Sequence, residues 1–216
     1  MAAPRQAPVR QACSGRWRNA ARLSLGAFLL LAACVTTDGA LTRVDHALAV
    51  GLGESMPSWL LWLLSWLTHL GDRNLLIGVA AIMTAGLLWR RAWHWAVMCV
   101  VVTGGGGLLN MAMKNAFERV RPEHLHGYAQ ESGWSFPSGH ASGAMAVYGF
   151  ACYLACCLLP ARWHRGCVAG AGVLILAIGA SRVLLQVHYL SDVLAGFALS
   201  LAWLAWCCAR PARTTC

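Results

Sequence analysis

The sequence predicts an all-helical membrane protein, a bundle of six transmembrane helices with short interfacial helices. Composition is the first reason: 58% of the 216 residues are hydrophobic, only 12% are charged and the mean hydropathy is +0.56. Ordinary soluble domains carry about 25% charged residues. The second reason is that the apolar residues form several runs close to the roughly 20 residues that cross a bilayer. Because no repeat or linker divides the chain, we expect one membrane domain over residues 21–209, with polar tails at 1–20 and 210–216.

The first crossing is expected at residues 20–37, where the apolar run 23–35 follows a leader that contains several arginines. Such a leader also precedes secretory signals, and Leu31-Ala32-Ala33-Cys34 resembles the cleavage box of a bacterial lipoprotein. We favour an uncleaved helix, because the leader is long and the rest of the chain is itself rich in membrane segments. Cys34 is then a packing residue.

Two shorter helices should follow, both at the membrane surface. Residues 41–52 mix apolar and charged side chains and predict an amphipathic helix. Residues 57–70 are almost wholly apolar but too short to cross, which is typical of an interfacial or re-entrant helix. Their Trp59, Trp62 and Trp66 recur at helical spacing, and we interpret them as interface anchors rather than as a lipid-binding stripe.

Longer apolar segments supply the remaining crossings, at residues 74–89, 93–115, 139–159, 166–185 and 191–208. The glycine run 104–107 permits either a close helix contact or a local kink, and we expect the close contact. Most cysteines lie in or beside apolar segments without a paired metal or redox spacing, so we interpret them as packing residues.

The net charge of +9 rests almost wholly on arginine, since Lys114 is the only lysine. The arginines stand in small groups between apolar runs rather than along one solvated face, so they indicate membrane topology and not nucleic-acid binding. Six crossings put the N-terminal tail, Arg90-Arg91, the 162–165 turn and the C-terminal tail on one side. The positive-inside rule makes that side, and both termini, cytoplasmic. The opposite side receives the connections 38–56, 116–137 and 186–190.

A turn sequence, Pro137-Ser138-Gly139-His140, precedes the fourth predicted crossing. Pro, Ser and Gly in this order are typical of a turn and a helix N-cap, so a helix should begin near Gly139 with His140 in its first turn. Unpaired backbone N–H groups and the positive end of the helix dipole make that position a seat for an anion such as phosphate. Trp134 and Phe136, just ahead of the turn, could stack on a substrate head group or anchor the loop at the interface.

Three cations should share the membrane face with this turn. Lys114 closes the third crossing, Arg121 follows two turns later if that helix continues, and Arg182 ends the fifth. A single cation at the end of a crossing is usually a snorkelling anchor. Three of them beside two histidines and a carboxylate instead indicate a site that neutralises the oxygens of a phosphoryl group.

His188 and Asp192 open the sixth crossing one helical turn apart, so the carboxylate can hold the imidazole. We therefore expect His188 to be the nucleophile and His140 the general acid for the leaving oxygen. The Ser138 hydroxyl and the Gly139 N–H group would bind the phosphate together with the three cations. This scheme requires no metal ion and no other cofactor.

These residues belong to three ordered motifs, which run from Lys114 to Arg121-Pro122, from Pro137 to His140, and from Ser181-Arg182 to His188 and Asp192. The set resembles the type-2 phosphatidic acid phosphatase family, membrane lipid phosphatases that share a site design with the soluble vanadium haloperoxidases. The resemblance implies a metal-independent lipid phosphatase whose site faces the periplasm or the outside, and it supports the roles given above to these residues, in which a phosphohistidine is the intermediate. The leader, the compact length and the short loops look bacterial, so we expect the bacterial inner membrane with the site at the periplasmic face. Undecaprenyl pyrophosphate is the first expected substrate, followed by phosphatidylglycerophosphate and phosphatidic acid.

Other functions would use the same residues or none of them. A lipid A phosphatase or a phosphotransferase would have the same site. A transporter would carry charges through the depth of the membrane or show two repeated halves, and the sequence has neither pattern. A non-catalytic lipid-binding protein would not need both histidines. The expected partners are the lipid substrate and the bilayer, without nucleic acid, and the sequence does not indicate an oligomeric state.

Two pairs of residues near the motifs carry separate expectations. Glu118 and Arg119 should form a local ion pair, with contact between Arg119 and a second phosphate as the alternative. His124 and His126 are too few for a defined metal site, so we interpret both as loop residues.

Overall fold

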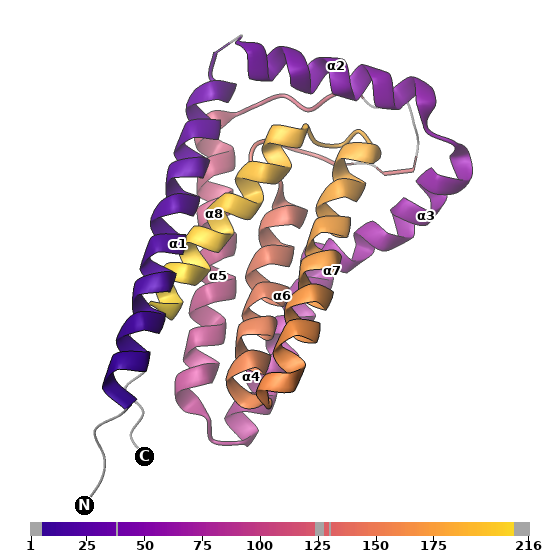
Figure 1. Cartoon of the computed structure of the whole chain (residues 1–216). Coiled ribbons are helices and arrows are strands. Elements are labelled where there is room, and N and C mark those ends of the chain that lie inside the picture. Colours follow the sequence, from indigo (N-terminus) through magenta and orange to yellow (C-terminus); the bar gives the residue numbers. More distant parts are fainter. Residues whose placement is uncertain (1–5, 38, 124–127, 130, 210–216) are drawn as a thin grey trace, which may run out of the picture.

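The computed structural model describes residues 6–37, 39–123, 128–129 and 131–209, and all regular secondary structure in this part of the chain is helical. The predicted all-helical fold class is therefore confirmed. Figure 1 shows the elements, which are α1 (Gln6–Val35), α2 (Ala40–Ser55), α3 (Ser58–Thr68), the short 3-10 helix η1 (His69–Gly71), α4 (Arg73–Trp89), α5 (Trp93–Phe117), α6 (Gly139–Leu158), the 3-10 helix η2 (Ala161–Trp163), α7 (His164–Leu184) and α8 (Leu190–Cys208).

Among the described residues, five helical segments are long and apolar enough to span a bilayer alone: α1 from Ser14, α5, α6, α7 with η2, and α8. A sixth span forms only if α3 and α4 count together, since α4 has 17 residues and the pair is bent by 42°. The crossing predicted at 74–89 is thus one half of a bent pair, and the short helix predicted at 57–70 is the other half. The bend lies at Asp72, which interrupts the apolar run.

The N-terminal helix is longer than predicted. α1 begins at Gln6, so the polar leader is already helical well before residue 20. Its candidate span starts at Ser14 and ends at Val35, close to the end of the crossing predicted at residue 37. Polar residues can extend a transmembrane helix into the aqueous phase because the helix satisfies its own backbone hydrogen bonds.

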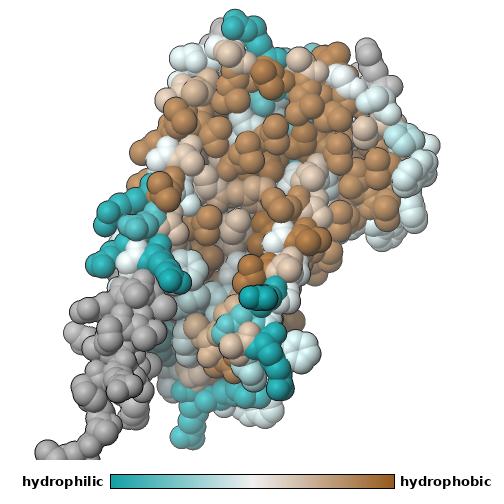
Figure 2. All heavy atoms as spheres, in the orientation of Figure 1, coloured by the Kyte–Doolittle hydropathy of each residue, from teal (hydrophilic) through white to brown (hydrophobic). Residues whose placement is uncertain are grey.

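α8 is the central helix of the bundle. It packs against α1, α5, α6 and α7, and 61% of its apolar window is buried, compared with 11% for α1. α2 lies across one end of the bundle rather than along it (Figure 1), as expected of the predicted surface helix. α1 begins and α8 ends at the opposite end. Apolar side chains cover the flank between the two ends in the view of Figure 2.

Small residues allow the helices to approach closely. A Cβ atom on Gly105 would come within 2.6 Å of Trp203 Cζ2 in α8, whereas Gly104 has open space around it. The glycine run therefore packs α5 against α8 and stays helical, which confirms the expected close contact. Several cysteines behave as predicted, since they lie in a buried core cluster that includes Cys99, Cys207 and Cys208.

Candidate active site

The residues predicted to carry chemistry lie at the end of the bundle that α2 covers. The predicted turn is present: Ser138 has an extended conformation (φ −64°, ψ 123°) and α6 begins at Gly139. The Ser138 N–H group donates to the carbonyl oxygen of Asp192 at 2.9 Å, which ties the start of α6 to α8. Asn110 Nδ2 in α5 lies 3.4 Å from the Pro137 carbonyl oxygen. Three helices thus hold the turn in place.

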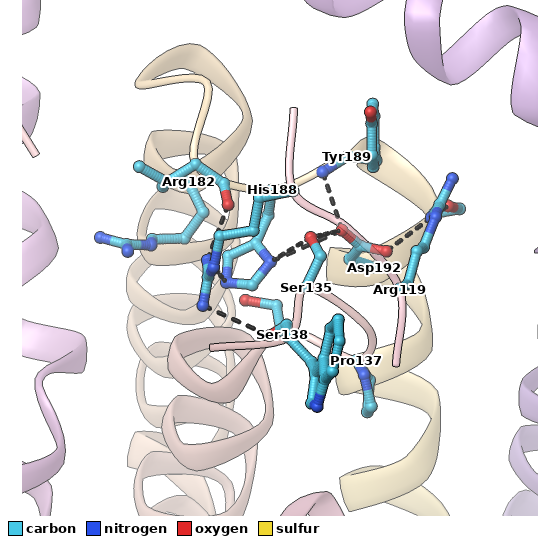
Figure 3. Close-up of polar contacts among 12 residues, drawn as sticks. Arg119, Ser135, Pro137, Ser138, Arg182, His188, Tyr189 and Asp192 are labelled. Atoms are coloured by element: carbon cyan, nitrogen blue, oxygen red, sulfur yellow. Dashed lines mark hydrogen bonds and ion pairs between the residues drawn. The ribbon is translucent and has the colours of Figure 1, made fainter. Parts of the chain in front are cut away.

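Two polar atoms here are buried without a hydrogen-bond partner among the described residues, the Ser138 hydroxyl and Nε of Arg182. Ser138 does not cap α6 with its side chain, and Arg182 is only 1% exposed. A buried donor that stays unpaired costs about 1–3 kcal/mol, and such groups are normally satisfied by protein, water or ligand. Both residues are predicted phosphate ligands, and both lie beside His188 in Figure 3.

His188 lies between α7 and α8 and is 2% exposed. Its Nδ1 atom is 3.2 Å from the Ser135 hydroxyl and 3.5 Å from Asp192 Oδ2. Ser135 donates to Asp192 Oδ2 at 2.5 Å, so its oxygen is free to accept from Nδ1, and the three side chains form a continuous chain (Figure 3). This chain places the ring proton on Nδ1 and leaves a lone pair on Nε2, the form that a nucleophile needs.

Arg121 faces the other ring nitrogen of His188, with Nη1 3.1 Å from Nε2. The conditional expectation that α5 continues to Arg121 is wrong, because α5 ends at Phe117 and Glu118 adopts a left-handed conformation with φ 45°. Arg121 instead comes from the following loop, where its Nε donates to the Gly133 carbonyl oxygen at 2.9 Å. Its guanidinium is thus fixed beside the predicted nucleophile.

Glu131 lies among the predicted phosphate ligands. Its Oε1 accepts a hydrogen bond from Arg182 Nη2 and is 3.7 Å from His140 Nδ1, and its Oε2 is 3.9 Å from Arg121 Nη2. Arg182 also donates from Nη1 to Thr68 Oγ1 at 2.6 Å. Guanidinium groups bind carboxylates and phosphates in the same way, so a phosphate at this position would replace the Glu131 carboxylate. Glu131 was not predicted from the sequence because it belongs to none of the motifs.

The loop before α6 also holds the predicted lysine. Lys114 Nζ donates to the Trp134 carbonyl oxygen at 2.5 Å, and its Cε would lie 3.9 Å from a Cβ atom on Gly139. Both expectations for Phe136 are wrong, because the ring is fully buried and stacks on Phe28 of α1 at a centroid distance of 6.0 Å. It can reach neither a head group nor the membrane interface.

His140 lies in the first turn of α6, as predicted, with Nε2 2.9 Å from Asp72 Oδ1. Asp72 comes from the break between η1 and α4 and also contacts His69 Nδ1 at 2.7 Å. The contact with Asp72 holds the His140 ring in place. A cavity of about 630 Å³ opens beside the pair, and its lining includes Asp72, Arg73, Asn74, Leu75, Glu131 and His140. No sequence pattern links Asp72 to His140, so this partner was missed as well.

Arg119 makes neither of the expected contacts. Its Nη2 is 2.9 Å from Asp45 Oδ2 in α2, and its Nη1 is 2.6 Å from Asp192 Oδ1. The guanidinium carbon lies 4.3 Å from the centre of the Tyr189 ring. The predicted local pair with Glu118 is therefore wrong, and the alternative, a second phosphate, is replaced by two carboxylates.

Burial and neighbouring charges set the protonation of the site. Desolvation lowers the pKa of His188 to about 3, against the opposing effect of Asp192, so the imidazole is neutral near pH 7. Burial would raise the pKa of Glu131, but Arg182 and other cations outweigh it and hold the pKa below its usual value. Burial would lower the pKa of Arg119, but its carboxylate partners raise it. The predicted nucleophile is therefore neutral and stands among fixed charges.

Within the described residues, no group of three or more His, Cys, Asp or Glu side chains is arranged to hold a metal ion. His124 and His126 lie outside those residues. The positive charge gathered around His188 and Glu131 comes from arginine and lysine side chains.

Comparisons with known proteins identify the family. The profile of the PAP2 superfamily matches residues 93–215. Phosphatidylglycerophosphatase B of Bacillus subtilis (strain 168) is 36% identical over 177 residues, which cover 81% of this chain and 86% of the relative. The lipid A 1-phosphatase of Rhizobium johnstonii is 33% identical over 208 residues, which cover 91% of this chain and 78% of that protein.

A solved structure extends the similarity to the fold. The crystal structure of a transmembrane PAP2-type phosphatidylglycerolphosphate phosphatase from Bacillus subtilis superposes with a TM-score of 0.80 at 33% identity. The match covers 87% of this chain and 93% of that one. The motifs, the helical bundle and these matches together show that this chain is an integral membrane lipid phosphatase and belongs to the PAP2 superfamily.

Proposed function

We propose that this membrane lipid phosphatase hydrolyses the terminal phosphate of a lipid phosphomonoester or pyrophosphate through a phosphohistidine on His188. The observation that carries the proposal is the placement of His188, whose Nδ1 faces Ser135 and Asp192 while Nε2 faces Arg121. An imidazole held in this way has its nucleophilic nitrogen directed at the cation cluster where a phosphate would bind.

Binding begins with replacement of the Glu131 carboxylate by the substrate phosphate. Lys114, Arg121 and Arg182 then neutralise its non-bridging oxygens. The two buried donors without partners, on Ser138 and Arg182, complete the set, together with N–H groups at the start of α6. Fixed donors of this kind stabilise the charge of a phosphoryl group in transfer without reorganisation.

In the first step the Nε2 lone pair of His188 attacks phosphorus. The N–P bond forms, the P–O bond to the lipid breaks, and the departing oxygen takes the proton of His140. Asp72 holds that imidazole at 2.9 Å. In the second step a water attacks phosphorus, gives its proton to His140, and the N–P bond breaks to release inorganic phosphate. Asp192 stabilises the cationic His188 ring between the two steps.

We order the candidate substrates by the names of the relatives. Phosphatidylglycerophosphate stands first because a relative bears the name phosphatidylglycerophosphatase B, and lipid A follows because of the lipid A 1-phosphatase. Undecaprenyl pyrophosphate and phosphatidic acid remain candidate substrates, since they present the same terminal phosphate. The open cavity beside His140 is compatible with leaving groups of different size.

The test is phosphate release by the detergent-purified full-length protein from these four lipids in the presence of EDTA. We expect release by the wild type, loss of release by His188→Ala, and no loss by His164→Ala at the far end of α7. His164 is a suitable control because its contact is to the Leu159 carbonyl oxygen, away from the site. Equal release by wild type and His188→Ala would overturn the nucleophile, and loss of wild-type release in EDTA would overturn metal independence.

A further inference from the structure

We propose that Asp45 and Arg119 are positioning residues for the nucleophile, through which the surface helix α2 fixes the orientation of Asp192 and His188. Asp45 lies outside the three motifs, and Arg119 occupies a position between Lys114 and Arg121 that the first motif does not specify. The inference rests on the proposed function, because it takes His188 to be the attacking group. α2 would then contribute to catalysis, although it lies across the end of the bundle and carries none of the predicted site residues.

Arg119 is the link between the two carboxylates. Its Nη1 donates to Asp192 Oδ1 at 2.6 Å and to the Ser191 hydroxyl at 2.7 Å, while its Nη2 donates to Asp45 Oδ2 at 2.9 Å. The side chains of Arg119, Asp45 and Asp192 are 11%, 1% and 0% exposed. The face of the Tyr189 ring packs on the guanidinium. Arg119 therefore has little freedom to rotate, and it fixes one oxygen of Asp192.

With Oδ1 fixed by Arg119, the other oxygen of Asp192 is directed at His188. Oδ2 accepts from the Ser135 hydroxyl at 2.5 Å and from the Tyr189 N–H group at 2.9 Å, and lies 3.5 Å from His188 Nδ1. If Arg119 were absent, the carboxylate would lose the contact that fixes Oδ1 and would be held only through Oδ2. The imidazole would then lose part of its orientation toward the phosphate.

α2 holds the nucleophile segment on both sides of His188. After it, Asp45 accepts from the Ser191 N–H group at 3.1 Å and from the Ser191 hydroxyl. Before it, Gln186 Nε2 donates to the Ala49 carbonyl oxygen at 2.5 Å. The segment from Gln186 to Ser191, which connects α7 to α8, is thus hydrogen-bonded to α2 at both of its ends. Asp45 acts through Arg119 and through the backbone of α8.

Charge balance favours a catalytic role over a purely structural one. Asp45 and Asp192 carry two negative charges against one positive charge on Arg119, so the cluster has a net charge of −1 while His188 is neutral. Attack on phosphorus makes the ring of His188 cationic, which neutralises the cluster. A buried ion pair adds little stability over an apolar replacement, whereas this one complements a charge that develops during the reaction.

The experiment compares Asp45→Asn, Arg119→Gln and the double variant in the detergent-purified full-length protein, with phosphatidylglycerophosphate as substrate. We expect kcat to fall about 10- to 100-fold in Arg119→Gln and less in Asp45→Asn, the range seen when partners of a reactive group are removed. KM and inhibition by orthovanadate should stay within about twofold, because the phosphate ligands are untouched. Arg43→Gln, an exposed arginine on the same helix, should match the wild type.

The double variant separates positioning from folding. Arg119→Gln leaves Asp45 and Asp192 buried without their cation, whereas the double change leaves only Asp192 in that state. The melting temperature of the double variant should therefore recover in part while its kcat stays near that of Arg119→Gln. Arg119→Lys keeps the cation but not the two-pronged contact and should have an intermediate kcat. Recovery of kcat together with melting temperature would overturn the inference. So would wild-type kcat in the single variants when His188→Ala is inactive, whereas an active His188→Ala would instead refute the proposed function.

Discussion

At the scale of single residues, the unpaired hydroxyl of Ser138 makes a sharp test of the phosphate site. Ser138→Ala removes a buried donor that has no partner among the described residues, so the folded protein loses no hydrogen bond. A bound phosphate would lose one, and we expect kcat/KM to fall about 100-fold, as for loss of one donor to a developing oxyanion. Phosphate release and the melting temperature of the same preparation measure the two effects.

Ser142, one turn further along α6, is the matched control. It is also buried, but its hydroxyl lies 2.6 Å from that of Ser200 in α8. Ser142→Ala should therefore cost about 1 kcal/mol of stability and leave kcat/KM close to that of the wild type. A Ser138→Ala variant that loses stability but keeps activity would show that the hydroxyl is structural.

A second residue-scale prediction concerns the neutral state of His188. Its pKa in the folded protein, about 3, lies below the ordinary value of 6.5. As pH falls through that ordinary value, the unfolded chain binds a proton on this residue and the folded protein does not. The stability contribution is thus fully present above about pH 6.5 and is lost as pH falls toward 3, with a slope of at most about 1.4 kcal/mol per pH unit.

His188→Gln removes this dependence. In detergent, the melting temperature of the variant relative to wild type should rise as pH is lowered from about 7 to about 4. The comparison isolates His188 because all other titrating groups are shared. Parallel melting curves over this range would mean that the residue titrates at its ordinary pKa in the folded protein.

The site residues differ in how far apart in the sequence the interacting partners lie. His188 and Asp192 are only four residues apart, and although His188 precedes α8, the short separation keeps the two side chains within 3.5 Å. Asp72 and His140 are 68 residues apart, and Asp45 and Arg119 are 74 apart. A single acidic residue in an apolar chain forms no sequence pattern from which its partner can be predicted. The motif residues were therefore predictable, whereas their carboxylate partners required the packing of α2 and the α3–α4 break.

At the scale of helices, hydrophobic runs predicted where the elements lie, but polar residues decided several boundaries. Apolar length located α5, α6, α7 and α8 to within a few residues. Whether α5 continues to Arg121 was not predictable, because the helix ends at the left-handed conformation of Glu118, a residue type compatible with continued helix. The early start of α1 was missed because its first turns are polar and leave no membrane signal.

The packing of α8 on α6 supports a prediction about one glycine. A Cβ atom on Gly196 would lie 2.7 Å from the Ser138 carbonyl oxygen and 3.2 Å from the Ser142 nitrogen, both backbone atoms. Gly196→Ala must therefore push the start of α6 away from α8, and we expect a loss of about 1–3 kcal/mol in stability. Activity should fall as well, because that start carries the proposed phosphate donors. Melting temperature and phosphate release test both effects.

Gly104→Ala is the control for the added methyl group. Gly104 also lies in a membrane helix, but nothing stands within 4 Å of a Cβ atom there. Alanine has a better helix propensity than glycine, by about 1 kcal/mol, so this variant should be as stable as the wild type or more stable. If both variants behave alike, the contact between α8 and the start of α6 does not position the site.

At the scale of the whole molecule, charge is distributed unequally between the two ends of the bundle. The described acidic side chains belong to segments at the site end: Asp45, Asp72, Glu118, Glu123, Glu131 and Asp192. The turns at the other end carry only cations among their described charged residues, at Arg90, Arg91, Arg162 and Arg165. Cations at the site end are largely engaged by carboxylates or backbone oxygens. Most of the free positive charge is therefore at the end away from the site.

The positive-inside rule turns this asymmetry into a prediction of orientation, with the arginine turns in the cytoplasm and the site at the periplasmic face. α8 ends on the arginine side (Figure 1), so the C-terminus should be cytoplasmic. A green fluorescent protein fused to the C-terminus should therefore fluoresce. Alkaline phosphatase fused there should stay inactive, because its disulfides form only after export. An active alkaline phosphatase and a dark fluorescent protein would invert the topology and place the phosphate site in the cytoplasm.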